Sequence, residues 1–86
     1  MPYRPGALWT SRCRGGKVAV NPRHEDFPAL LAEALDVVVA CGHDVKLAAP
    51  NLACTPSQLT KLLQLEPRAL LIVNQAREQL GLHKLK

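Results

Sequence analysis

Apolar residues recur at helical spacing in the part of the chain that follows residue 25. Between Phe27 and Cys41 they fall three or four residues apart, which is typical of one buried helix face. Asp26 is suited to cap such a helix and Gly42 to end it, so the spacing predicts a helix from Asp26 to Cys41. Glu33 falls on the opposite face, where we expect it to be solvated. The apolar positions are 27, 30, 31, 34, 35, 38 and 41.

Three more helical segments follow this one. A short segment runs from Asp44 to Leu52 and should bend or end near Pro50, because proline resists a helix interior. Thr55-Pro56-Ser57 is a strong start signal for the next helix, since it combines a capping hydroxyl with proline at the first helical position. Pro67 opens the last helix and Gly81 ends it. Its expected inward face comprises Ala69, Val73, Ala76 and Leu80.

A different pattern precedes the helices, in residues 7–21 (ALWTSRCRGGKVAVN). Two short runs with β-branched or aromatic members flank Gly15-Gly16, which can supply the positive φ angles of a tight turn. The pattern predicts a β-hairpin with strands near residues 8–13 and 17–20. We expect Trp9 to pack in the core. For Tyr3 two roles remain open: packing in the core, or stacking on an unpaired base.

Length and composition bound these elements to one small domain. The chain has 86 residues, 48% of them apolar and 21% charged, which argues against disorder. We expect a basic arm with a hairpin at 1–24 and a helical part at 25–86. No apolar run approaches the length of a membrane span and no secretory signal is evident, so we expect a cytoplasmic protein that does not engage membranes. A core this small leaves little room for a deep substrate pocket, so we expect no enzymatic activity.

Cysteine and histidine give no sign of a metal site or of a catalytic centre. The three cysteines are widely spaced and none forms a CxxC pair, so no disulfide framework is implied. Cys41 and His43 are neighbours, but no further ligand pair stands at a recognised spacing. We therefore predict no catalytic residue, no metal and no cofactor.

The positive charge is concentrated at the beginning of the chain. The net charge is +4, yet residues 1–24 contain no acidic side chain. Such a segment suits an arm that follows a phosphate backbone, because phosphate attraction scales with the number of cations. A solvated end that merely aids solubility remains the alternative. The five cations are Arg4, Arg12, Arg14, Lys17 and Arg23.

Residues 45–64 (VKLAAPNLACTPSQLTKLLQ) resemble the bacterial helix-turn-helix motif. Ala49 stands where the two helices of that motif touch, and Ala53 stands at the turn; helices can cross over such a short turn only if these side chains are small. Two departures are the alanine at a turn position that is often glycine, and Pro50 within the first helix. The apolar positions of the motif hold Leu52, Cys54, Leu59 and Leu62.

The sequence pattern and this resemblance together predict a mostly α fold, with a short N-terminal β-hairpin followed by about four helices that include the helix-turn-helix. The resemblance also implies a non-enzymatic nucleic-acid-binding module, with DNA favoured over RNA. Glutamine, lysine and serine can contact base edges or backbone, and arginine and lysine can contact phosphates. A homodimer on paired half-sites is compatible with this class. The candidate nucleic-acid-binding residues are Arg12, Arg14, Lys17, Arg23, Ser57, Gln58, Lys61 and Gln64. Lys84 and Lys86 could add phosphate contacts if the tail lies on the same side.

A second resemblance covers LWTSRCRGGKVAVNPRHEDFPALLAEALDVV and TPSQLTKLLQLEPRALLIVNQAREQLGL. These segments are similar to the C-terminal portion of bacterial proteins related to peptide chain release factors. That resemblance implies an accessory module in a ribosomal or RNA context. Those proteins hydrolyse peptidyl-tRNA with a Gly-Gly-Gln loop in a domain upstream of this portion. In this chain Gly15-Gly16 is followed by Lys17 and not by glutamine, so that activity is not implied. A third hypothesis is a protein-interaction adaptor that uses the exposed region around Leu71 and Ile72.

Overall fold

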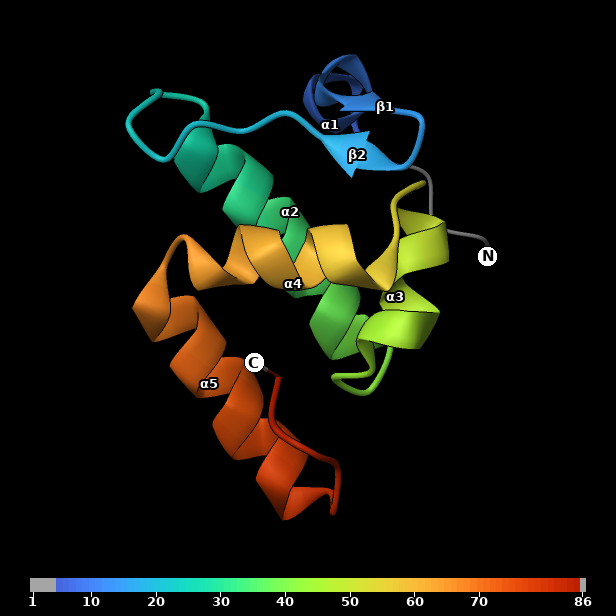
Figure 1. The fold of residues 1–86 in the computed structure, drawn as a ribbon, viewed down its shortest axis with the longest axis vertical. Helices are drawn as coiled ribbons and strands as arrows, with labels where there is room; N and C mark the ends of the chain where they lie inside the picture. Colours follow the sequence, from blue (N-terminus) through green and yellow to red (C-terminus); the bar gives the residue numbers. More distant parts are fainter. Residues whose placement is uncertain (1–4, 86) are drawn as a thin grey trace.

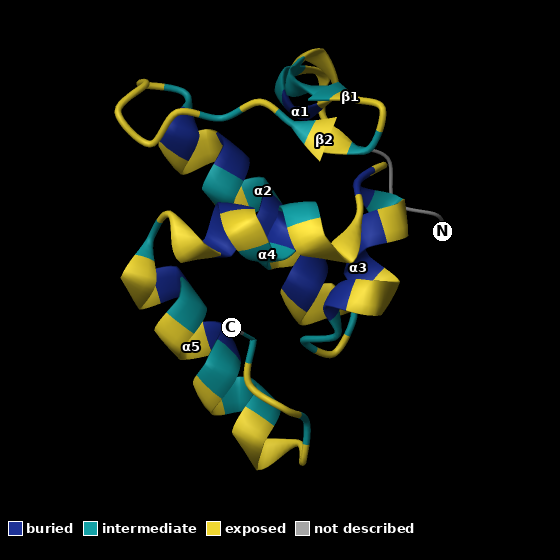
Figure 2. Cartoon of the chain, viewed as in Figure 1, coloured by how far each residue is buried: buried dark blue, intermediate teal, exposed yellow. Residues whose placement is uncertain are grey.

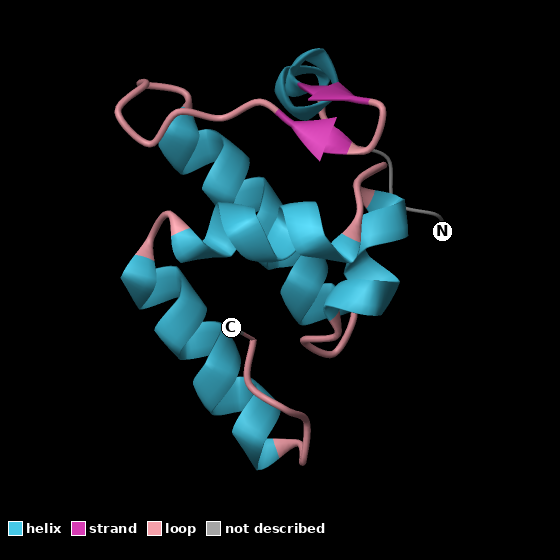
Figure 3. Ribbon diagram, in the orientation of Figure 1, coloured by secondary structure: helices cyan, strands magenta, loops and turns pink. Residues whose placement is uncertain are grey.

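The computed structural model describes residues 5–85, which form five helices and one two-stranded antiparallel hairpin (Figures 1 and 3). The predicted class, mostly α with a short N-terminal hairpin followed by four helices, is confirmed. Tyr3, Arg4 and Lys86 lie outside the described residues. The elements are α1 (Ala7–Arg12), β1 (Cys13–Arg14), β2 (Lys17–Val18), α2 (Phe27–Ala40), α3 (Val45–Asn51), α4 (Pro56–Gln64) and α5 (Pro67–Gln79).

The helices begin and end close to the predicted residues. The side chain of Asp44 accepts a hydrogen bond from the backbone N–H of Lys46 at 2.9 Å, which caps α3. Thr55 caps α4 in the same way, accepting from the N–H of Gln58 at 3.2 Å. Gly42 directly follows the C-cap of α2 and has a φ of 68°, a conformation that glycine adopts without strain.

α3 ends at Asn51, one residue after Pro50, as predicted. The proline lies exposed in the last turn of the helix, where its ring meets solvent. Because so few residues follow it, the missing N–H removes only one of the final hydrogen bonds of a short helix.

The prediction of a strand at residues 8–13 is wrong, because most of this segment forms α1. Each strand has only two residues, with Cys13 opposite Val18 and Arg14 opposite Lys17. A helical turn satisfies the backbone locally and directs Trp9 inward, whereas so short a hairpin offers little pairing. The Gly15-Gly16 turn is confirmed, with φ angles of 56° and 81°.

The core lies where α2, α3 and α4 meet beneath α1 (Figure 2). Trp9 is fully buried in it, as predicted, and its indole N–H donates to the carbonyl of Leu52 at 2.7 Å. The inward placement of Leu80 is wrong, since this side chain is 58% exposed. The C-terminal segment packs back along α5 (Figure 1), where the side chain of Asn74 bonds to the backbone of Leu85. No helix of residues 5–85 is long and apolar enough to cross a membrane.

Two carboxylates of the α2 region bind partners that the helical pattern did not predict. Asp26 stands at the N-cap of α2, but its side chain accepts from the guanidinium of Arg12 at 2.7 Å and makes no cap bond. Glu33, expected to be solvated, accepts from the backbone N–H of Gly6 at 2.7 Å. Both carboxylates therefore tie the N-terminal segment to α2.

Candidate nucleic-acid interface

Helices α3 and α4 are separate elements joined by residues 52–55. Ala49 is fully buried at their contact, and its carbonyl accepts from the N–H groups of Leu52 and Cys54 at 3.0 and 3.1 Å. Ala53 is exposed in the turn with a φ of 54°. A small buried residue thus precedes the turn, and a small residue with a left-handed backbone lies within it.

The N-terminal segment holds this turn in place through three contacts. The indole of Trp9 bonds to the carbonyl of Leu52, and the Sγ of Cys13 lies 3.0 Å from the carbonyl oxygen of Ala53. The backbone N–H of Thr55 donates to the carbonyl of Gly16 at 3.2 Å. These contacts span about forty residues of sequence, and periodicity gave no signal for them.

Helix α4 is amphipathic, and its two faces divide as the sequence pattern predicts. Leu59, Leu62 and Leu63 are buried. Ser57, Lys61 and Gln64 are exposed, and Gln58 and Thr60 flank them at intermediate exposure. In Figure 2, buried and exposed residues alternate along α4, which lies across the front of the molecule between the hairpin and the C-terminus.

A hollow of about 530 Å³ lies between the hairpin and Gln58 of α4, and most of the predicted arm cations line it. Arg12, Arg14 and Lys17 line it together with Gln58 of α4. We call this the hairpin hollow. The hairpin cations and one candidate base-contacting residue therefore share a single concave surface.

A second hollow, of about 450 Å³, lies between α4 and the C-terminal segment. Ser57, Lys61 and Gln64 line it with Lys84, and we call it the tail hollow. The segment is held along α5 by Asn74, whose side chain bonds twice to the backbone of Leu85, at 2.7 and 3.1 Å. Lys84 thus lies on the same side as Lys61.

The cations of the two hollows differ in how freely they can meet an anion. Within residues 5–85, Arg14, Lys17 and Lys61 form no ion pair. Arg12 is paired with Asp26 at 2.7 Å. The ammonium of Lys84 lies 2.8 Å from Glu78, and this hydrogen-bonded carboxylate raises the pKa of the lysine.

Arg23 is the candidate residue that the fold does not bring to α4. It lies exposed on the loop before α2 and lines neither hollow. Its backbone N–H donates to the side chain of Asn21 at 2.9 Å, which stabilises the loop. The other candidate residues line the two hollows on either side of α4.

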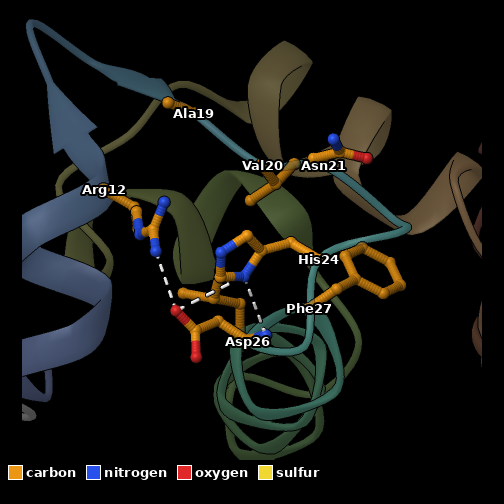
Figure 4. A pocket seen from close by; sticks show the side chains of 8 residues that line it. Arg12, Ala19, Val20, Asn21, His24, Asp26 and Phe27 are labelled. Atoms are coloured by element: carbon orange, nitrogen blue, oxygen red, sulfur yellow. Dashed lines mark hydrogen bonds and ion pairs between the residues drawn. The ribbon is translucent and has the colours of Figure 1, made fainter.

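A smaller hollow of about 240 Å³ lies behind Arg12, between the loop and the start of α2 (Figure 4). There the Nδ1 of His24 accepts from the backbone N–H of Asp26 at 3.1 Å and lies 3.5 Å from its carboxylate. Arg12 lines both this hollow and the hairpin hollow. The ion pair with Asp26 therefore directs the Arg12 guanidinium toward the start of α2 (Figure 4).

The described residues contain no arrangement suited to metal binding. Within residues 5–85, no three His, Cys, Asp or Glu side chains are grouped so as to hold a metal ion. Burial, with a contribution from neighbouring Cys13, raises the pKa of Cys54 to about 11. Most of this thiol is therefore protonated at neutral pH, and little of it is present as the nucleophilic thiolate.

Comparison of the chain with protein-family models, with curated proteins and with solved structures finds no match.

Proposed function

We propose that the chain is a non-enzymatic nucleic-acid-binding module in which α3 and α4 act as a helix-turn-helix and α4 contacts duplex DNA. The observation that carries this proposal is the flanking of the polar face of α4 by cations on both sides. Arg12, Arg14 and Lys17 line one flank, and Lys84 lines the other beside Lys61. We further propose that the module works in the cytoplasm.

The side chains on α4 are chemically suited to a major groove. Glutamine can bond to the edge of adenine through two hydrogen bonds, and lysine can reach guanine or a phosphate. Gln58 and Gln64 lie one on each flank, with Lys61 between them in sequence. Base contacts of this kind need phosphate contacts to fix the orientation of the helix, and the two hollows supply cations for that role.

Salt-dependent binding to a DNA duplex tests the proposal. The logarithm of the binding constant should fall linearly with the logarithm of salt concentration, and each lost phosphate contact should flatten the slope by about one unit. We expect Lys61→Glu to weaken binding. We expect the double variant Arg14→Ala/Lys17→Ala to flatten the slope by about two units. Fluorescence anisotropy with a labelled mixed-sequence duplex measures both effects.

Lys46→Glu provides the matched control. Lys46 is exposed on α3 and lines neither hollow, so the same charge reversal there should change the affinity less than Lys61→Glu does. Equal losses from the two variants would indicate nonspecific attraction and would contradict a role for α4. Unchanged binding in both Lys61→Glu and the double variant would also refute the proposed surface.

The same binding experiment distinguishes DNA binding from two other classes of function. A stronger affinity for structured RNA, with co-sedimentation on ribosomes, would favour an accessory module in translation. No salt-dependent binding to any nucleic acid would favour a protein-interaction adaptor. One observation supports the adaptor hypothesis: Leu71 and Ile72 of α5 are 58% and 62% exposed, which makes them candidates for a protein contact.

A further inference from the structure

Two of the three cysteines lie together where the hairpin meets the α3–α4 turn. The Sγ of Cys13 is 3.0 Å from the carbonyl oxygen of Ala53, the residue directly before Cys54, and 3.7 Å from that of Leu52. The backbone pairs at the same place, because Gly16 forms a parallel bridge with Cys54. Cys13 also packs against the core cluster that contains Cys54. The two thiols therefore belong to one contact between distant parts of the chain.

The remaining cysteine stands apart from this contact. Cys41 follows α2, and its Sγ accepts a hydrogen bond from the side-chain amide of Asn51 at 3.6 Å. All three cysteines are free thiols in the structure. Cys41 thus provides an internal comparison for any reaction of the other two.

We propose that Cys13 and Cys54 are an oxidation site, at which a low-molecular-weight disulfide drives formation of an intramolecular disulfide between the hairpin and the turn. The thiolate of Cys13, the more exposed of the two, attacks one sulfur of the small disulfide, forms a mixed disulfide and releases one small thiol. The thiolate of Cys54 then attacks the sulfur of Cys13, forms the protein disulfide and releases the second small thiol. The two protons lost by the protein thiols end on the two released thiols.

The environment of Cys54 determines the rate of the second step, in which its thiolate attacks the mixed disulfide on Cys13. Burial and the neighbouring Cys13 raise the pKa of Cys54 to about 11, so little of its thiolate is present at neutral pH. The mixed disulfide on Cys13 should therefore accumulate first and convert to the protein disulfide. That conversion should become faster by roughly tenfold for each unit of pH between 7 and 9, because the thiolate fraction rises by that factor.

The test treats the folded wild-type protein with oxidised glutathione, blocks the remaining thiols and maps the peptides by mass spectrometry. We expect a linked pair containing Cys13 and Cys54, a protein mass that is lower by about 2 Da before the thiols are blocked, and Cys41 alkylated by the blocking reagent. Cys41→Ser should give the same linked pair. Cys13→Ser should give none, and Cys54→Ser should stop at the mixed disulfide on Cys13.

Linkage of Cys41 to either cysteine, linkage only between two chains, or a mixed disulfide that never converts up to pH 9 would overturn the proposal. These outcomes are read on the wild-type protein and do not depend on whether a variant folds. Thermal unfolding adds an independent readout. A disulfide that fits the native contact closes a loop of about forty residues and should raise Tm by roughly 10 °C or more. A lower Tm in the oxidised protein would show that the bond strains the contact, against the proposal.

Discussion

Replacement of Ala53 by glycine should stabilise the protein. Ala53 has a φ of 54°, in the left-handed region, where an L-residue with a Cβ is strained by about 1–2 kcal/mol. Its side chain is exposed, so removal of the methyl group leaves no cavity. Glycine adds freedom to the unfolded chain, which opposes the gain by roughly 0.5–1 kcal/mol. The difference favours the variant by about 0.5–1 kcal/mol.

Ala32→Gly is the matched control for this substitution. Ala32 is also exposed, but it lies within α2, where the backbone is right-handed and alanine is the most favourable residue. The same methyl group is removed, and the cost in unfolded-state freedom is the same. Without strain to relieve, we expect Ala32→Gly to lower the free energy of unfolding by about 1 kcal/mol.

Urea unfolding measures both variants. The fluorescence of Trp9, the one tryptophan of the chain, reports the transition because this side chain is fully buried in the fold. In thermal unfolding, the Tm of the two variants should move in opposite directions, by roughly 4–8 °C for each kcal/mol in a domain of this size. A loss of stability in Ala53→Gly equal to that in Ala32→Gly would refute the claim that the turn strains Ala53.

Three further predictions concern burial, capping and ionisation. Trp9→Phe removes the hydrogen bond to Leu52 and part of a fully buried ring, so it should cost about 2–4 kcal/mol in urea unfolding followed by circular dichroism; a cost below about 1 kcal/mol would contradict this. Asp44→Ala should cost about 1 kcal/mol through loss of the α3 cap, whereas Asp36→Ala, exposed in mid-helix, should cost less than about 0.5 kcal/mol; equal costs would exclude capping as the cause. Folded Cys54 keeps its proton up to a pKa of about 11, while an unfolded thiol loses it near 9, so the free energy of unfolding should fall as the pH rises from 9 to 11. The free energy of unfolding of Cys54→Ala should fall less between pH 9 and 11. If the free energies of the two proteins fell in parallel with pH, that would argue against the raised pKa.

The helical half of the fold could be predicted because its signals are local. Periodicity located α2, the segment predicted from Asp44 located α3, and the start signal at Thr55-Pro56 located α4, each within a residue. The exposed face of α4 followed from the same periodicity, since three buried leucines fix the rotation of the helix. These predictions needed no knowledge of distant partners.

The N-terminal segment could not be predicted in the same way, because distant partners determine it. Residues 8–12 contain an aromatic and a β-branched side chain, a pattern that favours a strand, yet the burial of Trp9 under the α3–α4 turn is satisfied by a helix. Asp26 lies at the N-cap position of α2, but its carboxylate accepts a hydrogen bond from the charged guanidinium of Arg12 instead of capping the helix. The two hollows beside α4 likewise arise from tertiary packing of the hairpin and the tail.

The three contacts on the α3–α4 turn set a lower limit on the fragment that can be excised intact. A peptide begun at residue 25 would retain every helix after the hairpin but would lose Trp9, Cys13 and Gly16. The carbonyls of Leu52 and Ala53 would lose their donors, and the N–H of Thr55 would lose its acceptor. Any minimised version, fusion partner or graft of this helix pair must therefore carry the first segment with it, at least from Ala7 onward.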